Sequence, residues 1–198
     1  MDGRKANAET TQAALRSAGR RLFGELGFEK TALGALCTEA GVTTGALYHH
    51  FGDKKGLFAA VAEELDAALV HLVQGAMAQA AQAGATPWDA FLSGMDAFLA
   101  AAQDAQARRI GLTDAPAVLG TQGWLEIRER QGLGAMVRTV EGLQAAGALS
   151  SGDARLRARL VLGLLYGALE ALDHDPRPWE QALPDARALL HAMLAGLR

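Results

Sequence analysis

The chain has 198 residues, half of them hydrophobic, and a net charge of −3. This composition supplies enough apolar side chains for a sizeable buried core and excludes an intrinsically disordered chain. The longest apolar stretch, residues 160–172, is interrupted by Gly and Glu and is shorter than the roughly 20 residues of a membrane span, so we expect no contact with a membrane.

The start of the chain and its cysteine content predict a cytoplasmic protein. The first twenty residues mix acidic and basic side chains and lack the apolar segment of a secretory signal. Cys37 is the only cysteine, so it has no disulfide partner in the chain, and no metal-ligand pattern surrounds it. We expect no cofactor and no bound metal.

Charge is distributed unevenly along the chain. Residues 1–58 contain eight Lys or Arg and six Asp or Glu, a net charge of +2, whereas the remainder contains eleven and sixteen, a net charge of −5. All four lysines precede residue 56. This asymmetry favours a nucleic-acid-binding N-terminal part.

Helix-forming residues dominate, and no stretch alternates polar and apolar residues as a strand would, so we expect an all-α fold of about nine helices. The first helix is predicted over residues 8–26, with Leu15, Leu22 and Phe23 at helical spacing and Gly27 just past its end. Short helices follow, and they are predicted over residues 33–40 and 44–50.

The rest of the chain predicts longer helices. Asp53 is a suitable cap for a helix that runs to about Ala83, and Thr86 with Pro87 begins the next one. Because Gly and Pro punctuate residues 108–123, we expect that stretch to be broken. The last helices are predicted over residues 124–146, 153–172 and 184–197.

Residues 31–58 have the features of two helices packed at a steep angle. Ala40 is small where the helices approach, and Gly41 can adopt the left-handed backbone of a tight turn. Thr43 or Thr44 can cap the second helix, whose exposed first amides would then face phosphates. The side chains expected in the core of this segment are Leu33, Leu36, Val42, Leu47 and Phe51.

This segment closely resembles the N-terminal domain of the TetR family of bacterial transcriptional regulators, in particular AcrR-like members. The residues that carry the resemblance are Phe23, Gly27-Phe28, Thr31, Leu33, Leu36, Ala40-Gly41-Val42, Thr43, Gly45, Leu47-Tyr48, His49-His50-Phe51, Lys54 and Leu57. The sequence departs from the family pattern at Ala32, where Ser or Thr is frequent, and at Cys37, where Ala is common. The resemblance implies a helix-turn-helix DNA-binding domain over residues 1–53 and an effector-binding and dimerisation domain over residues 54–198.

The resemblance also implies how the segment contacts double-stranded operator DNA. The residues implied to contact phosphates are Thr31, Tyr48, His50 and Lys54. Those implied to face the major groove are Thr43, Thr44, Gly45, Ala46 and His49. The alternative interpretation makes Tyr48 a core aromatic and Lys54 part of a solvated helix start. A metal site at His49 and His50 is disfavoured because adjacent helical residues diverge by about 100°.

The C-terminal part is implied to form a homodimer through its last two helices and to bind an unknown small-molecule effector. Gly163, Gly167 and Ala171 lie at four-residue spacing, which permits close approach of another helix. The candidate effector-pocket residues are Trp88, Phe91, Met95, Phe98, Trp124, Arg128 and Tyr166, with His71 as an alternative polar anchor to Arg128. An aromatic stripe at helical spacing is also typical of an ordinary core.

Together with these features, the resemblance implies a homodimeric repressor that binds a palindromic operator and is released by its effector. An activator, or a DNA-binding regulator without an effector, remains open as the alternative. We do not expect an enzyme, because the sequence has no phosphate-binding loop, nucleophile elbow or zinc-protease motif. The one dense polar triplet, Asp173-His174-Asp175, precedes Pro176 and is more typical of a loop.

Overall fold

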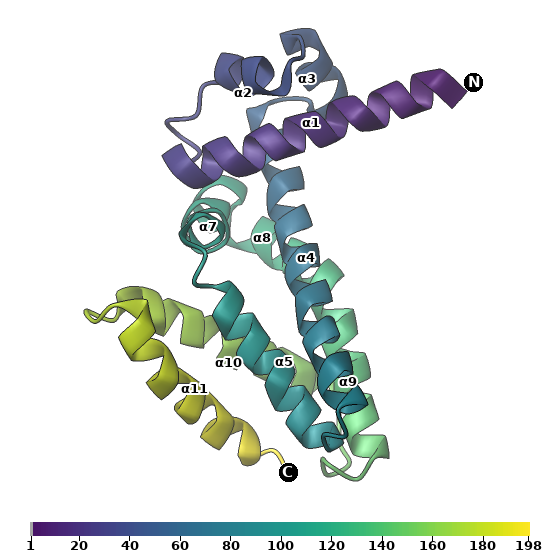
Figure 1. The fold of residues 1–198 in the computed structure, drawn as a ribbon, viewed down its shortest axis with the longest axis vertical. Coiled ribbons are helices and arrows are strands. Elements are labelled where there is room, and N and C mark those ends of the chain that lie inside the picture. Colours follow the sequence, from purple (N-terminus) through teal and green to yellow (C-terminus); the bar gives the residue numbers. More distant parts are fainter. Residues whose placement is uncertain (1) are drawn as a thin grey trace. The chain divides into compact units, whose positions relative to one another are not determined.

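The computed structural model describes residues 2–198, with side chains from Asn7 onward, and all regular structure in this range is helical. The first elements are α1 (Asp2–Leu26), α2 (Leu33–Ala40), α3 (Thr44–Phe51), α4 (Lys54–Gln82) and α5 (Pro87–Ala101) (Figure 1). They are followed by α6 (Ala105–Arg108), η1 (Arg109–Asp114), α7 (Ala115–Leu119), α8 (Thr121–Arg128), η2 (Glu129–Leu133) and α9 (Gly134–Ala145). The last two are α10 (Ala154–His174) and α11 (Trp179–Ala195). The predicted all-α class is confirmed.

Two of the helices contain a wider π-helical turn. The segments α6, η1 and α7 follow one another without a break, as do α8, η2 and α9, so the described residues form nine continuous helices. The predicted break over residues 108–123 is therefore wrong for most of its length. Pro116 lies in the first turn of α7, where a residue without a backbone N–H is tolerated, two residues after the π turn ends at Asp114. The helix ends only at Gly120, where φ is 78°.

The ends of three helices also bear on the predictions. Asp53 caps α4 as expected, since its Oδ1 accepts the N–H of Gly56 at 2.7 Å. By contrast, α1 begins at Asp2 rather than Ala8. The last helix begins at Trp179, before the predicted start at Pro184, because Pro178 occupies the cap position and the proline inside the helix lies near its beginning.

The chain forms two compact units. Unit 1 contains the chain up to Leu65 together with Asp104–Ile127, and unit 2 contains Asp66–Gln103 and Arg128–Arg198. This division differs from the predicted one between residues 53 and 54, because a later segment of the chain packs against the N-terminal helices. Met1, where the predicted first domain begins, lies outside the described residues.

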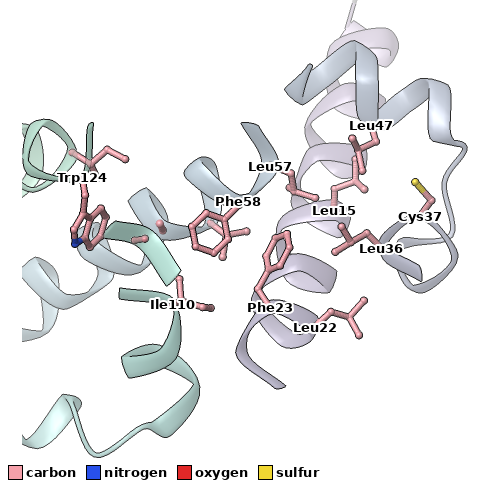
Figure 2. Packing of buried hydrophobic residues seen from close by; sticks show 14 residues of the cluster. Leu15, Leu22, Phe23, Leu36, Cys37, Leu47, Leu57, Phe58, Ile110 and Trp124 are labelled. Atoms are coloured by element: carbon pink, nitrogen blue, oxygen red, sulfur yellow. The ribbon is translucent and has the colours of Figure 1, made fainter. Parts of the chain in front are cut away.

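The core of unit 1 holds the helix-turn-helix segment together. Leu36 and Leu47 are fully buried, and Leu33, Val42 and Phe51 pack against them while half-buried, so the predicted core set is confirmed. Figure 2 shows Phe23 and Phe58 facing each other, with ring centroids 5.1 Å apart and nearly perpendicular planes. Such edge-to-face aromatic pairs stabilise a core by more than the burial of their apolar surface alone.

Unit 2 is built around α5 and α10. The expected inward side chains of α5 are buried, namely Phe91, Met95, Phe98 and Leu99. Val161 and Leu165 of α10 are 1% exposed. None of the helices in the described part of the chain has the length and hydropathy needed to cross a membrane.

Candidate functional site

The turn between α2 and α3 fixes the orientation of α3. Gly41 ends α2 with φ 66°, a left-handed conformation that glycine adopts without a Cβ penalty. The following N–H, that of Val42, donates to the carbonyl of Cys37 at 3.0 Å. Leu36 and Leu47, one from each helix, are fully buried behind the turn. The two helices are therefore held as one unit, and the outer face of α3 is left for contacts.

The N-terminal turn of α3 presents polar groups to solvent. The Oγ1 of Thr43 caps the helix by accepting the N–H of Ala46 at 3.3 Å, and its own hydroxyl proton remains available to donate. Thr44 and Gly45 are exposed beside it, and Ala46 is half-buried. Because the first amides of a helix carry a partial positive charge, this end of α3 is suited to a phosphate group or another anion.

The second turn of α3 adds aromatic side chains. Tyr48 is 53% exposed, which excludes the alternative that it is a core aromatic, and His49 is exposed as well. His50 is half-buried, and its Nδ1 lies 3.4 Å from Nε2 of Gln12 on α1. His50 therefore connects α3 to α1, whereas the side chains of Tyr48 and His49 are exposed to solvent.

Two of the predicted phosphate contacts need correction. Thr31 is 1% exposed, and its hydroxyl bonds with the carbonyl oxygens of Gly27 at 2.7 Å and Leu22 at 3.2 Å. This hydroxyl closes the turn after α1 and has no surface from which to reach DNA.

Lys54 is engaged in a similar way. Its Nζ donates to the carbonyl oxygens of Phe28 at 2.9 Å and Thr31 at 3.1 Å, and it lies 4.2 Å from the centroid of the Phe28 ring. Charge-assisted hydrogen bonds of this kind are about twice as strong as neutral ones. The ammonium therefore fastens the start of α4 to the α1–α2 loop, and we assign Lys54 to the scaffold.

A segment distant in sequence supports the C-terminal end of α1. Oδ2 of Asp114 accepts the N–H of Phe28 at 2.8 Å, and the guanidinium of Arg109 donates to the carbonyl of Glu25. Arg20 on α1 pairs with Asp104 at 2.7 Å. Sequence reasoning missed these contacts, since single charged residues about 85 positions apart form no recognisable motif.

Unit 2 encloses a small cavity between α4, α5, α9 and α10, with a volume of about 50 Å³. Three of the predicted pocket residues line it, namely Met95, Phe98 and Tyr166. Trp88 and Phe91 are buried in unit 2 outside this lining, and Trp124 belongs to the core of unit 1. His71 is exposed on α4 and is not part of the lining. These four residues therefore do not line this cavity.

Ionisable side chains lie close together at the cavity. Asp66 and Tyr166 both line it, and Asp66 is 6% exposed. The guanidinium of Arg128 lies 3.7 Å from the centroid of the Tyr166 ring. Burial raises the pKa of Tyr166 well above its usual range, and the negative charge of Asp66 acts in the same direction. Sequence reasoning missed Asp66, which reads as an ordinary polar residue of a long helix.

The outer face of α10 and α11 is apolar. Leu160, Leu189 and Met193 are each more than half exposed, and they border a groove of about 740 Å³. A Cβ added to Gly163 or Gly167 would meet no atom within 4 Å. This face has the small residues and the apolar side chains that close helix packing requires.

The polar triplet before Pro176 is occupied by local contacts. His174 Nδ1 lies 2.8 Å from the carbonyl oxygen of Glu170, and Asp175 pairs with Arg177 at 2.9 Å. Among the described residues, no three His, Cys, Asp or Glu side chains are placed to hold a metal ion together.

Comparisons with known families match both parts of the chain. A family model described as "Bacterial regulatory proteins, tetR family" matches residues 15–61, and one described as "Tetracyclin repressor-like, C-terminal domain" matches residues 88–197. The HTH-type transcriptional regulator AcrR of Shigella flexneri is 41% identical over 59 residues, which cover 30% of this chain and 27% of AcrR. The matches to curated relatives thus span about a third or less of their length.

Solved structures match over nearly the whole chain. A TetR-family transcriptional regulator from Pectobacterium atrosepticum is 33% identical and superimposes with a TM-score of 0.82, covering 97% of this chain and 96% of its own. RolR in complex with resorcinol is 17% identical with a TM-score of 0.74, covers 96% of this chain and 88% of its own, and shares the fold. Relatives of this kind are transcriptional regulators rather than enzymes, and the chain belongs to the TetR family of helix-turn-helix transcriptional regulators.

Proposed function

We propose that this protein is a homodimeric cytoplasmic repressor that binds a palindromic DNA operator through α3 and releases it when a small molecule enters the cavity of unit 2. The observation that carries the proposal is the outer face of α3, where Thr43, Thr44, Tyr48 and His49 are exposed around a buried Leu47. A helix that presents hydroxyl and imidazole groups beside its own N-terminus fits the major groove and its flanking phosphates.

The roles proposed for the α3 side chains follow from their chemistry and exposure. Tyr48 and His50 contact phosphates. Thr43, Thr44, Gly45, Ala46 and His49 face the base edges. Gly45 lets the helix backbone come close to the DNA, and Ala46 is suited to contact a thymine methyl group. Because hydrogen-bonding side chains are few on this face, DNA shape contributes to specificity as well.

Dimerisation through α10 and α11 is proposed from the apolar groove on these helices. An isologous pair of such faces forms a four-helix interface, and its two-fold axis predicts an operator with two inverted half-sites. The name of the matched family model, repressor-like, supports repression over activation. A regulator that activates, or that has no effector, is the alternative.

Effector release is proposed from the cavity and from the chain path. Helix α4 begins in unit 1 and ends in unit 2, as does the helix formed by α8, η2 and α9, so a ligand in unit 2 acts on helices that continue into the DNA-binding unit. Release requires that the ligand binds one arrangement of the recognition helices more tightly than the other. RolR, a protein of the same fold, was solved with the ligand resorcinol, which supports a small-molecule effector.

Fluorescence anisotropy with labelled DNA from the region upstream of the protein's own gene tests the proposal. We expect salt-sensitive binding that selects an inverted repeat over scrambled DNA of equal length. Binding that is equal for the repeat and the scrambled DNA at every salt concentration would contradict an operator-specific role.

The base-facing assignment is tested separately with Thr44→Ala and His49→Ala. Each change is expected to weaken binding to the operator by about 1–3 kcal/mol and to relax selectivity at particular base pairs. A selection of randomised half-sites measures this preference for each variant. Thr38→Ala, an exposed change on α2, serves as the matched control. If both variants select the same half-sites as the unaltered protein, these side chains do not read the bases.

A further inference from the structure

The cavity of unit 2 is mostly apolar, with polar side chains at four lining positions. Asp66 and Tyr166, which interact electrostatically, form what we call the polar end. Gln74 and Thr139 also line the cavity, and the Thr139 hydroxyl donates to the carbonyl oxygen of Ala135 at 3.1 Å. Phe98 belongs to the apolar part. Three of the chain's five methionines, Met77, Met95 and Met136, also line it. A pocket with one polar end and an apolar body selects molecules of the same two-part character.

The polar end offers hydrogen-bond acceptors. The carboxylate of Asp66 has only acceptor atoms, and the hydroxyl of Tyr166, which lines the same cavity, can also accept. Both residues can therefore accept a hydrogen bond from a ligand. A head group that donates, such as a hydroxyl, is favoured over a ketone, ether or ester, whose oxygen would face the Asp66 carboxylate.

The charge of Asp66 is already balanced by a neighbouring cation. Arg128 stacks 3.7 Å from the Tyr166 ring centroid, interacts electrostatically with Asp66, and is not part of the cavity lining. A charged ligand would lose its hydration in the cavity, and no further side chain of opposite charge would compensate for that loss. The site therefore favours an uncharged head group.

The size of the cavity limits the body of the ligand. Its volume of about 50 Å³ is well below the roughly 150 Å³ of a cavity that holds benzene, so side chains must move to admit one ring. Methionine side chains are unbranched and flexible, and three of them line this wall. A single ring or a short alkyl chain is the largest body that such local movement accommodates.

From these features we infer that the effector is a small uncharged molecule with a hydroxyl group, a phenol or a short-chain alcohol, whose hydroxyl donates to Asp66 beside Tyr166. Its apolar body lies against Phe98 and the methionines. The inference rests on the proposed function, since it names the chemical class that would release the repressor.

The test measures binding to the protein in the absence of DNA, so that it is independent of operator recognition. Titration calorimetry compares four one-ring probes: phenol, toluene, benzoate and benzylammonium. We expect phenol to bind at least tenfold more tightly than toluene, which lacks a donor, and than the two charged probes. Tyr166→Phe is expected to weaken phenol binding at least fivefold and to leave toluene binding unchanged.

A matched pair of glycine substitutions locates the site. A Cβ on Gly132 would lie 4.0 Å from the Tyr166 hydroxyl, in the space that the head group needs, whereas a Cβ on Gly142 in α9 would meet no atom within 4 Å. Both changes to alanine favour helix, so both variants should remain folded. We expect Gly132→Ala to reduce phenol affinity at least tenfold and Gly142→Ala to leave it unaltered.

The inference fails if toluene, benzoate or benzylammonium binds as tightly as phenol, if no probe binds, or if Gly132→Ala and Gly142→Ala bind phenol equally well. Anisotropy with operator DNA is then still decisive for the proposed function: specific operator binding that phenol does not affect separates a wrong effector class from a wrong assignment as a regulator.

Discussion

Residues of the same type have different roles in unit 1 according to their burial. The hydroxyl of Thr31 is enclosed and bonds with two backbone carbonyls, whereas Thr44 is exposed at the start of α3. Lys54 is held by two carbonyls and an aromatic ring, whereas its neighbour Lys55 is exposed. A polar group withdrawn from water stays bound to its hydrogen-bond partners. The hydrogen bonds of Thr31 and Lys54 therefore help to hold the DNA-binding surface in shape.

Replacing Lys54 by methionine separates a scaffold role from a phosphate contact. Lys54→Met keeps the length of the side chain but loses the hydrogen bonds to Phe28 and Thr31, so we expect a loss of about 1–3 kcal/mol in the free energy of unfolding. The salt dependence of operator binding should stay unchanged. Lys55→Met is the control and should have little effect on stability. A salt slope that decreases by about one in Lys54→Met would instead indicate a direct phosphate contact.

Tyr166 should stay protonated at alkaline pH. Tyr48→Phe leaves Tyr166 as the only tyrosine, so phenolate absorbance then reports on that residue alone. Because burial raises its pKa, we expect no phenolate signal from the folded variant near pH 10, the ordinary value. Above pH 10 the unfolded chain loses this proton and the folded protein keeps it, so the free energy of unfolding falls as pH rises. The same variant in denaturant should titrate near pH 10; identical titrations of the folded and unfolded samples would show that Tyr166 is exposed to water.

At the level of elements, glycine allows α1 to pack against α6. A Cβ on Gly24 would lie 2.6 Å from the Cβ of Gln106, closer than carbon atoms normally approach. This close approach lets Arg109 and Asp114 reach the end of α1 and the loop after it. The position of the α6–α7 segment in unit 1 therefore depends on Gly24, which the sequence does not distinguish from other residues inside a helix.

The change Gly24→Ala is expected to destabilise the protein even though alanine favours helix. We expect a loss of about 1–3 kcal/mol, because the added methyl group forces α6 away from α1. Gly34→Ala in α2 is the matched control, since a Cβ there would meet no atom within 4 Å, and it should stabilise by up to about 1 kcal/mol. Thermal unfolding of both variants measures the difference. Equal stabilisation by the two changes would mean that α6 does not pack closely on α1.

At the scale of the whole molecule, the apolar face of α10 and α11 is exposed to water in a single chain. Leu189 is 61% exposed there, and large apolar patches on monomers are uncommon. In a two-fold dimer each residue of this face occurs twice near the axis, so a single substitution changes the interface at two places.

Accordingly, Leu189→Glu should convert the proposed dimer into monomers. The change places two negative charges near the two-fold axis and removes apolar contact area. Operator affinity should decrease because fewer dimers form. Light scattering coupled to size-exclusion chromatography gives the mass. Leu72→Glu, at a residue 50% exposed on α4, is the control and should leave the mass unchanged. A Leu189→Glu variant that keeps the mass of the unaltered protein would place the interface elsewhere.

The sequence by itself determined the all-α class, the helix-turn-helix and the family. Helical periodicity, the glycine turn at Gly41 and the caps at Thr43 and Asp53 are local features, and the bounds of α2 agree with the prediction because they depend on neighbouring residues alone. The buried positions Leu36 and Leu47 follow from the same periodicity.

Only the tertiary structure decided which polar residues are available and which distant segments meet. Thr31 and Lys54 match the family motif, yet their hydrogen-bond partners become known only when the α1–α2 loop is folded. The association of Asp104–Ile127 with unit 1, and the presence of Asp66 and Tyr166 in one cavity lining, bring together residues tens of positions apart. Such contacts depend on how the helices pack, so they cannot be predicted from the spacing of residues along the chain.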